Sequence, residues 1–195
     1  MFKMKIIYLV LFLLFSPFSY ATMTRGVFDP GSTFAVCFTP FHPCNEFILD
    51  LLNNAQRSIK VQAYGMSNCA IIRALVDAKK RGVEVTILLD KGALLSKYNF
   101  ILFDLHKSGI PFLIDYQTGI AHNKLIIVDD EYVETGSFNY YQDIEKINAE
   151  NLLIIKSKNL VPYYVANFDK LKNLSKPYII PESLLSQPHA TCLRE

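Results

Sequence analysis

Two short stretches of the 195-residue chain decide its fold: AHNKLIIVD at residues 121–129 and ETGSFN at residues 134–139. Side chains two positions apart on a β-strand point to the same face, so we expect His122 and Lys124 to project together. Residues 125–128 are apolar on both faces. This pattern indicates a strand buried inside a sheet, with the polar pair at its entrance.

The second stretch predicts another strand end beside the first. We expect this strand to end at Thr135, with Gly136 allowing a tight turn and Ser137 capping a helix that begins near Phe138. A helix N-terminus binds anions, and Asn139 in its first turn adds an amide donor. Two strand ends therefore converge on a histidine, a lysine, an asparagine and backbone donors.

These groups suit chemistry at a phosphoryl centre. His122 can attack phosphorus, while Lys124 and Asn139 balance the charge on the non-bridging oxygens. The constellation contains no clustered carboxylates of the kind that hold Mg²⁺. We therefore expect a metal-independent phosphodiesterase that needs no cofactor.

Strand-like and helix-like segments alternate along the rest of the chain. The expected strands are residues 33–38, 58–64, 83–89, 112–115, 125–128, 132–135 and 151–156. The expected helices are residues 45–55, 68–81, 100–107 and 160–174. This alternation predicts an α/β fold with a mixed, largely parallel sheet and helices on both faces. We expect a loop at residues 90–99 and an irregular tail from Ser175.

The N-terminus predicts export. Lys3 and Lys5 precede an apolar run, and a small-residue site ends at Ala21, which together indicate a signal peptide at residues 1–21. An uncleaved N-terminal anchor is the alternative. Cleavage leaves one domain at residues 22–195, periplasmic or secreted, with no stable membrane span. It also removes the formal net charge of +2, so overall charge gives no support for a nucleic-acid partner.

The four cysteines allow two interpretations. In an oxidising compartment Cys37 and Cys44 are close enough in sequence to form a disulfide. Alternatively, Cys37, His42 and Cys44 could bind zinc with Cys69 or Cys192, although the spacing matches no paired Cys-x-x-Cys pattern. Cys69 is most simply a small buried residue at the start of a helix.

The quoted stretches resemble the phospholipase D superfamily, whose signature is His-x-Lys, four residues, Asp, six residues, then Gly-Ser-x-Asn. The positions that match are His122, Lys124, Asp129, Gly136, Ser137 and Asn139. The likeness is greatest to the short exported bacterial endonucleases of the superfamily. It implies a phospholipase D-like fold and a phosphohistidine intermediate. It also places Glu150 on the carboxylate that orients the nucleophilic histidine, within one chain or across a dimer.

The remaining polar residues receive plainer roles. Asp129 lies an odd number of residues from His122 and near a turn, so we expect it to support the structure, whereas Ser137 is expected to bind substrate phosphate. Lysines and an arginine at residues 79–81 precede Gly82, as cations often do at a helix end. The other histidines match no motif position and are not expected to be catalytic: His42, His106 and His189.

The chain carries a single copy of the motif. In an in-line displacement the nucleophile and the leaving oxygen lie on opposite sides of phosphorus, so one imidazole cannot serve both. A two-fold homodimer brings two copies of His122 face to face, one as nucleophile and one as general acid. The single-motif members of the superfamily are dimers, which the resemblance implies here as well.

The substrate class follows from the motif and the resemblance. We expect a low-specificity endonuclease that acts on DNA, with RNA as a further substrate, and that binds through phosphate contacts. The candidate phosphate contacts are Lys91, Lys97, Lys107 and Lys146. Tyr140 and Tyr141 could stack on bases or belong to the core. The alternatives are a phospholipase D acting on membrane lipids and a non-catalytic nucleic-acid-binding protein.

Overall fold

The computed structural model describes residues 24–95, 100–117, 119–186 and 190–193. The expected signal peptide at residues 1–21, the candidate phosphate contact Lys97 and the non-motif histidine His189 lie outside these ranges.

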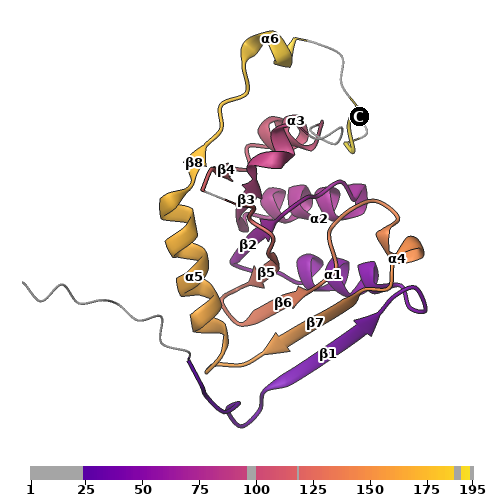
Figure 1. The fold of residues 1–195 in the computed structure, drawn as a ribbon, viewed down its shortest axis with the longest axis vertical. Coiled ribbons are helices and arrows are strands. Elements are labelled where there is room, and N and C mark those ends of the chain that lie inside the picture. The colour runs from indigo at the N-terminus through magenta and orange to yellow at the C-terminus, as the bar shows by residue number, and fades with distance from the viewer. Residues whose placement is uncertain (1–23, 96–99, 118, 187–189, 194–195) are drawn as a thin grey trace, which may run out of the picture.

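One eight-stranded sheet runs through the molecule in the order β1-β7-β6-β5-β2-β3-β4-β8 (Figure 1). The strands in that order are Thr33–Phe38, Asn151–Lys156, Tyr132–Gly136, Lys124–Val128, Ser58–Ala63, Glu84–Asp90, Phe112–Asp115 and Lys176–Pro177. The strand carrying Lys124 therefore lies in the interior of the sheet, and all its residues are buried. This burial confirms the expectation drawn from its unbroken apolar run.

The strands pair in both directions. β2 pairs with β3 and β3 with β4 in parallel, whereas the other neighbours pair antiparallel. The mixed α/β class is confirmed, but the expected proportion of parallel pairs was too high. One reason is that β5 and β6 fold back on each other through the short connection at residues 129–131, whereas parallel neighbours need a helical crossover.

Helices cover both faces of the sheet, as expected (Figure 1). On one face lie α1 (Cys44–Asn53), α2 (Cys69–Lys80) and α3 (Phe100–Lys107), which pack on the larger apolar core. On the other face α5 (Val161–Leu174) packs on a smaller core that includes Leu125 and Ile127 of β5. The buried strand β5 thus contributes side chains to both cores. This packing holds its first residue, Lys124, in place.

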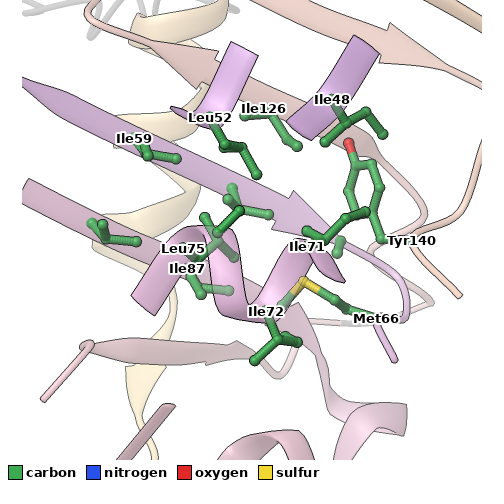
Figure 2. Close-up of a cluster of buried hydrophobic side chains, with 14 of the residues drawn as sticks. Ile48, Leu52, Ile59, Met66, Ile71, Ile72, Leu75, Ile87, Ile126 and Tyr140 are labelled. Carbon is green, nitrogen blue, oxygen red and sulfur yellow. The ribbon is translucent and has the colours of Figure 1, made fainter. Parts of the chain in front are cut away.

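The larger core is built from branched aliphatic side chains at the expected spacing (Figure 2). Ile71, Ile72 and Leu75 on α2 are fully buried above Ile59 and Ile87 of the central strands. Burying each side chain of this size contributes about 1.5–3 kcal/mol. The side chain of Asn68 caps α2 by accepting hydrogen bonds from the backbone of Ala70 and Ile71.

Three local expectations need correction. Residues Lys91–Leu94 form a short 3-10 helix within the expected loop. The tail from Ser175 is not wholly irregular, because it contains β8 and the short helix α6 (Glu182–Leu185). Finally, no helix begins near Phe138; the next helix is α4 (Ile144–Ile147), so the expected anion site at a helix N-terminus is absent from this part of the described chain.

All four cysteines are paired in disulfides, Cys37 with Cys44 and Cys69 with Cys192. The Cys37–Cys44 disulfide is the one expected. The expectation for Cys69 was wrong, because it forms a disulfide and is not simply a small buried residue. The zinc interpretation is wrong because the sulfur atoms it needs as thiolates are bonded to one another. The second disulfide joins residues 123 positions apart and ties the C-terminal tail to the start of α2.

Within the described part of the chain, no helix is both long and apolar enough to cross a membrane.

Candidate active site

The candidate site lies along one edge of the sheet, where four strands begin or end. The register pairs Ala63 at the end of β2 with Lys124 at the start of β5. It also pairs Gly136 at the end of β6 with Leu152 near the start of β7. Side chains that follow β2 and β6, or precede β5 and β7, therefore meet at this edge. The motif residues His122, Ser137, Asn139 and Glu150 all occupy such positions.

His122 and Lys124 project together, as the sequence predicts. Lys124 Nζ lies 2.9 Å from His122 Nδ1 and donates a 2.8 Å hydrogen bond to the His122 carbonyl oxygen. An ammonium group has donors only, so with Lys124 charged His122 Nδ1 is the acceptor and Nε2 carries the proton of a neutral ring. The lysine thus holds both the ring and the backbone of the histidine.

Lys124 is the buried cation of the site, with 6% of its surface exposed. Burial lowers the pKa of its ammonium group, and the charge of the Glu150 carboxylate opposes that shift. A partly desolvated cation interacts strongly with an anionic substrate, because little water screens it. Lys124 can therefore stabilise charge on a phosphoryl oxygen.

Tyr64 is a residue of this site that the motif did not identify. Its ring centroid lies 4.8 Å from that of His122, and Lys124 Nζ lies 5.6 Å from the Tyr64 centroid. Tyr64 directly follows β2, which pairs with β5, so strand pairing places it beside the motif. Tyr64 packs against the imidazole ring of His122, and only the tertiary structure reveals this contact.

Asn139 lies in the irregular segment between β6 and α4. The next residue, Tyr140, holds this segment to the start of α2, since its carbonyl oxygen accepts hydrogen bonds from the backbone of Ser67 (2.8 Å) and Asn68 (3.0 Å). Asn139 Oδ1 is buried and has no hydrogen-bond partner among the described residues. The amide is therefore held at the site edge by backbone contacts of its neighbour and not by a helix.

Ser137 and Glu150 contact each other across the ends of β6 and β7. The Ser137 hydroxyl donates to Glu150 Oε2 and accepts a 3.1 Å hydrogen bond from the Asn151 backbone. Glu150 Oε1 accepts a further hydrogen bond of 2.9 Å from Asn148 Nδ2. The expected phosphate contact of Ser137 requires its bond to Glu150 to open and stays a prediction. The orientation of His122 by Glu150 also stays a prediction. Within the described residues, the hydrogen bonds of the Glu150 carboxylate come from Ser137 and Asn148 and not from His122.

Gly136 is required by a close approach of two strands. A Cβ atom at this position would lie 2.2 Å from the backbone oxygen of Asn151. The Ser137 backbone donates a 3.1 Å hydrogen bond to the same oxygen. The sequence attributed Gly136 to a tight turn, whereas the structure attributes it to the contact that brings Ser137 against Glu150.

Asp129 lies at the other end of β5, away from His122. Its carboxylate accepts hydrogen bonds from the backbone of Gln56 (3.0 Å), Arg57 (2.7 Å) and Ser58 (2.9 Å). These bonds lower the pKa of Asp129 against the opposing effect of burial. The carboxylate thus ties the start of β2 to the end of β5, in keeping with the structural role expected for it.

The two tyrosines after the motif have different environments. Tyr140 is fully buried and donates a 2.5 Å hydrogen bond to Glu134, which makes it a core residue rather than a stacking surface. Tyr141 packs against Gly65, where a Cβ atom would lie 2.0 Å from its hydroxyl oxygen. Tyr141 and Tyr64 both line a cavity of about 120 Å³.

The candidate lysines are dispersed. Lys91 donates a 2.9 Å hydrogen bond to the Gln117 carbonyl oxygen, and Lys146 forms a 2.7 Å ion pair with Asp143 near the site edge. Lys107 lies at the end of α3 and lines a separate pocket with Lys80 of α2. The basic cluster at residues 79–81 occupies the last turn of α2 and the position after it, as is usual for cations at a helix end.

Within the described ranges, no three His, Cys, Asp or Glu side chains are grouped so that they could hold a metal ion.

A family model, related sequences and solved structures all show similarity between this chain and proteins of the phospholipase D superfamily. Residues 48–172 match the family model described as cardiolipin synthase, PLD-like domain. The chain is 43% identical over 144 residues to a protein named phospholipase D from Rickettsia prowazekii, which covers 74% of this chain and 70% of the relative. It is 31% identical over 124 residues to the mitochondrial cardiolipin hydrolase of Xenopus tropicalis, covering 64% of this chain and 59% of that protein.

Among solved structures, the chain resembles the phospholipase D family member Nuc from Salmonella typhimurium. The two superpose with a TM-score of 0.71 and 32% identity, over 75% of this chain and 98% of Nuc. The family match spans the strands that position His122, Lys124, Ser137 and Asn139. By its sequence, its fold and the family model that it matches, this chain belongs to the phospholipase D superfamily.

Proposed function

We propose that the chain hydrolyses phosphodiesters without a metal ion, with His122 as the nucleophile. The observation that carries the proposal is the contact between His122 and Lys124, in which a buried ammonium group lies 2.9 Å from the imidazole Nδ1. A substrate phosphate entering this edge meets a nucleophile and a poorly screened cation together. The charge of Glu150 acts on the same lysine.

Substrate binding prepares the nucleophile in this proposal. A phosphate oxygen draws Lys124 Nζ away from His122 Nδ1, which then can hold the ring proton and leave Nε2 with a free lone pair. Nε2 forms a bond to phosphorus as the bond from phosphorus to the leaving oxygen breaks. Lys124 and the Asn139 amide stabilise the charge on the non-bridging oxygens.

A homodimer supplies the second imidazole. His122 of the partner subunit, with its proton on Nε2, donates that proton to the leaving oxygen. It then takes a proton from the water that hydrolyses the phosphohistidine. The single motif in the chain and the in-line geometry of phosphoryl transfer support this arrangement.

We propose a nucleic acid as the substrate, cleaved as an endonuclease would cleave it. The similarity to Nuc over 98% of that chain supports this substrate, together with the resemblance of the motif to short bacterial endonucleases. Tyr64 and Tyr141 beside the cavity offer aromatic faces for bases. Two disulfides support the further proposal that the chain works after export in an oxidising compartment.

A membrane phospholipid is the second candidate substrate. Phe41 is 84% exposed and Ile147 is 74% exposed. The segments that carry them are joined by a hydrogen bond from Thr39 to the Asn148 carbonyl oxygen. Exposed apolar side chains beside a site can enter the surface of a bilayer. The Rickettsia relative named phospholipase D supports this alternative.

The test gives the purified protein plasmid DNA, RNA, phosphatidylcholine and cardiolipin separately in EDTA. Cleavage of the nucleic acids alone supports the first proposal, and cleavage of the lipids alone replaces it with the second. His122→Ala should abolish whichever activity is found while the circular dichroism spectrum stays unchanged. Activity that disappears in EDTA and returns with Mg²⁺ would contradict both.

A further inference from the structure

The segment between Cys37 and Cys44 holds one buried polar side chain. Thr39 is 3% exposed, although Phe38 beside it is 53% exposed. Cys37, two positions earlier, is also buried, because alternate residues of an extended segment face the same side. Thr39 therefore points inward, toward the segment that carries Glu150.

Thr39 makes three hydrogen bonds to that segment. Its backbone donates to the Glu150 carbonyl oxygen (3.0 Å), and its Oγ1 accepts from the Glu150 backbone (2.8 Å). Its hydroxyl donates to the Asn148 carbonyl oxygen at 2.6 Å. The hydroxyl thus uses its only donor and one acceptor position to hold the backbone on both sides of residue 149.

The backbone so held carries the carboxylate of the site. Glu150 accepts hydrogen bonds from Ser137 Oγ and Asn148 Nδ2, and its charge acts on Lys124. The position of the carboxylate relative to the lysine depends on where the backbone of residue 150 lies. Thr39 fixes that backbone, and none of its hydrogen bonds within the described residues goes to His122 or Lys124.

A disulfide closes the segment that presents Thr39. Cys37 lies in β1 and Cys44 is the first residue of α1, so the bond between them holds both ends of the segment. The following residue is also tied to the site edge, because the Asn45 backbone donates a 2.9 Å hydrogen bond to Glu145 of α4.

We propose that Thr39 is the positioning residue for Glu150 and that the Cys37–Cys44 disulfide keeps it in place. The inference rests on the proposed function, in which Glu150 and Lys124 act on a phosphodiester. Its consequence is that cleavage depends on the oxidation state of a disulfide that does not touch the reacting groups.

The first test compares Thr39→Val with Thr39→Ser, using bis(p-nitrophenyl) phosphate as the probe. Valine keeps the shape and loses the hydroxyl, so kcat should fall by up to about 100-fold while KM changes little. Serine restores the hydroxyl and should recover most of kcat. Thr33→Val, at the start of the strand that Thr39 follows, is the matched control and should leave kcat unchanged. A Thr39→Val protein with the kcat of the wild type would overturn the proposal.

The second test removes each disulfide in turn. Cys37→Ala/Cys44→Ala should lower kcat, whereas Cys69→Ala/Cys192→Ala should lower thermal stability and keep kcat. Equal kcat values in the two double variants would overturn the role given to the first disulfide. The melting temperature of each variant separates loss of fold from loss of positioning.

Amide hydrogen exchange distinguishes this proposal from the proposed function. The Glu150 amide donates to Thr39 Oγ1, so its exchange should be faster in Thr39→Val than in Thr39→Ser. This readout needs no catalysis. If the wild type cleaves no phosphodiester, the proposed function fails while exchange still reports on Thr39. Unchanged exchange in Thr39→Val would contradict the positioning role even in an active enzyme.

Discussion

The hydroxyl of Tyr140 donates a 2.5 Å hydrogen bond to Oε2 of Glu134, and neither side chain is exposed to solvent. Glu134 lies on β6 and Tyr140 follows Asn139, so the pair joins the sheet to the segment that carries the motif asparagine. Burial raises the pKa of Glu134 to about 8, with the bond from Tyr140 opposing the shift. The second carboxyl oxygen, Oε1, has no hydrogen-bond partner within the described residues.

This pair predicts a stability that falls as pH rises. The folded protein keeps the Glu134 proton up to pH about 8, whereas the unfolded chain releases it near the ordinary value of 4.5. Between these values the free energy of unfolding should decrease by up to about 1.4 kcal/mol per pH unit from this group. Glu134→Gln keeps the acceptor for Tyr140 and removes the titration. Urea unfolding from pH 5 to 9 should be less pH-dependent in the variant, and identical slopes would contradict the assignment.

Lys124 predicts the alkaline limit of activity. Burial lowers its pKa, so its ammonium group is lost at a lower pH than that of an exposed lysine. The rate of cleavage should fall on the alkaline side below pH 10.5, the ordinary lysine value. Glu150→Gln removes the charge that opposes the shift and should move this limb to lower pH. Lys124→Arg should move it to higher pH, because a guanidinium group stays charged. A pH–rate profile shared by all three proteins would exclude Lys124 as the titrating group.

Gly136 predicts a steric effect on the site. A Cβ atom would meet the backbone oxygen of Asn151 at 2.2 Å, so Gly136→Ala must separate the ends of β6 and β7. We expect a loss of about 1–3 kcal/mol in the free energy of unfolding and a lower kcat. Gly26→Ala is the matched control, since a Cβ atom there meets no atom within 4 Å. Equal unfolding midpoints for the two variants would show that β6 and β7 adjust without strain.

Replacing Asp129 should lower the free energy of unfolding and leave kcat unchanged. Asp129→Asn replaces an oxygen that accepts backbone N–H groups with an amide donor, which should cost about 1.5–3 kcal/mol of unfolding free energy. The kcat of the folded variant should stay near that of the wild type, because Asp129 lies at the far end of β5 from His122. Asp130→Asn, which removes only a surface ion pair with Lys60, should change stability by less than about 1 kcal/mol. A large fall in kcat for folded Asp129→Asn would give the residue a role in the chemistry.

The features that the sequence predicts well are those set by neighbouring residues. The period of two places His122 beside Lys124, and the apolar run at residues 125–128 forms a buried strand. Helical spacing locates α2, and the basic residues before Gly82 mark its end. These features depend on local geometry, which residues close together in the chain determine.

The features that the sequence misses depend on pairing between distant segments. Tyr64 reaches His122 because β2 pairs with β5, and Cys69 finds Cys192 across 123 positions. No helix begins near Phe138 in the described chain; Tyr140 is instead buried, donates a hydrogen bond to Glu134 and forms a β-bridge with Met66. Hydrophobicity patterns contain no information about such partners.

The central claim, that His122 attacks phosphorus without a metal ion, is tested most directly by trapping the intermediate. The purified protein is mixed with a labelled phosphodiester in EDTA, quenched within one turnover and digested for mass spectrometry. We predict an acid-labile phosphoryl adduct on the peptide that contains His122, and its absence in His122→Ala. Turnover in EDTA with no adduct on this peptide, or an adduct on another residue, would contradict the claim.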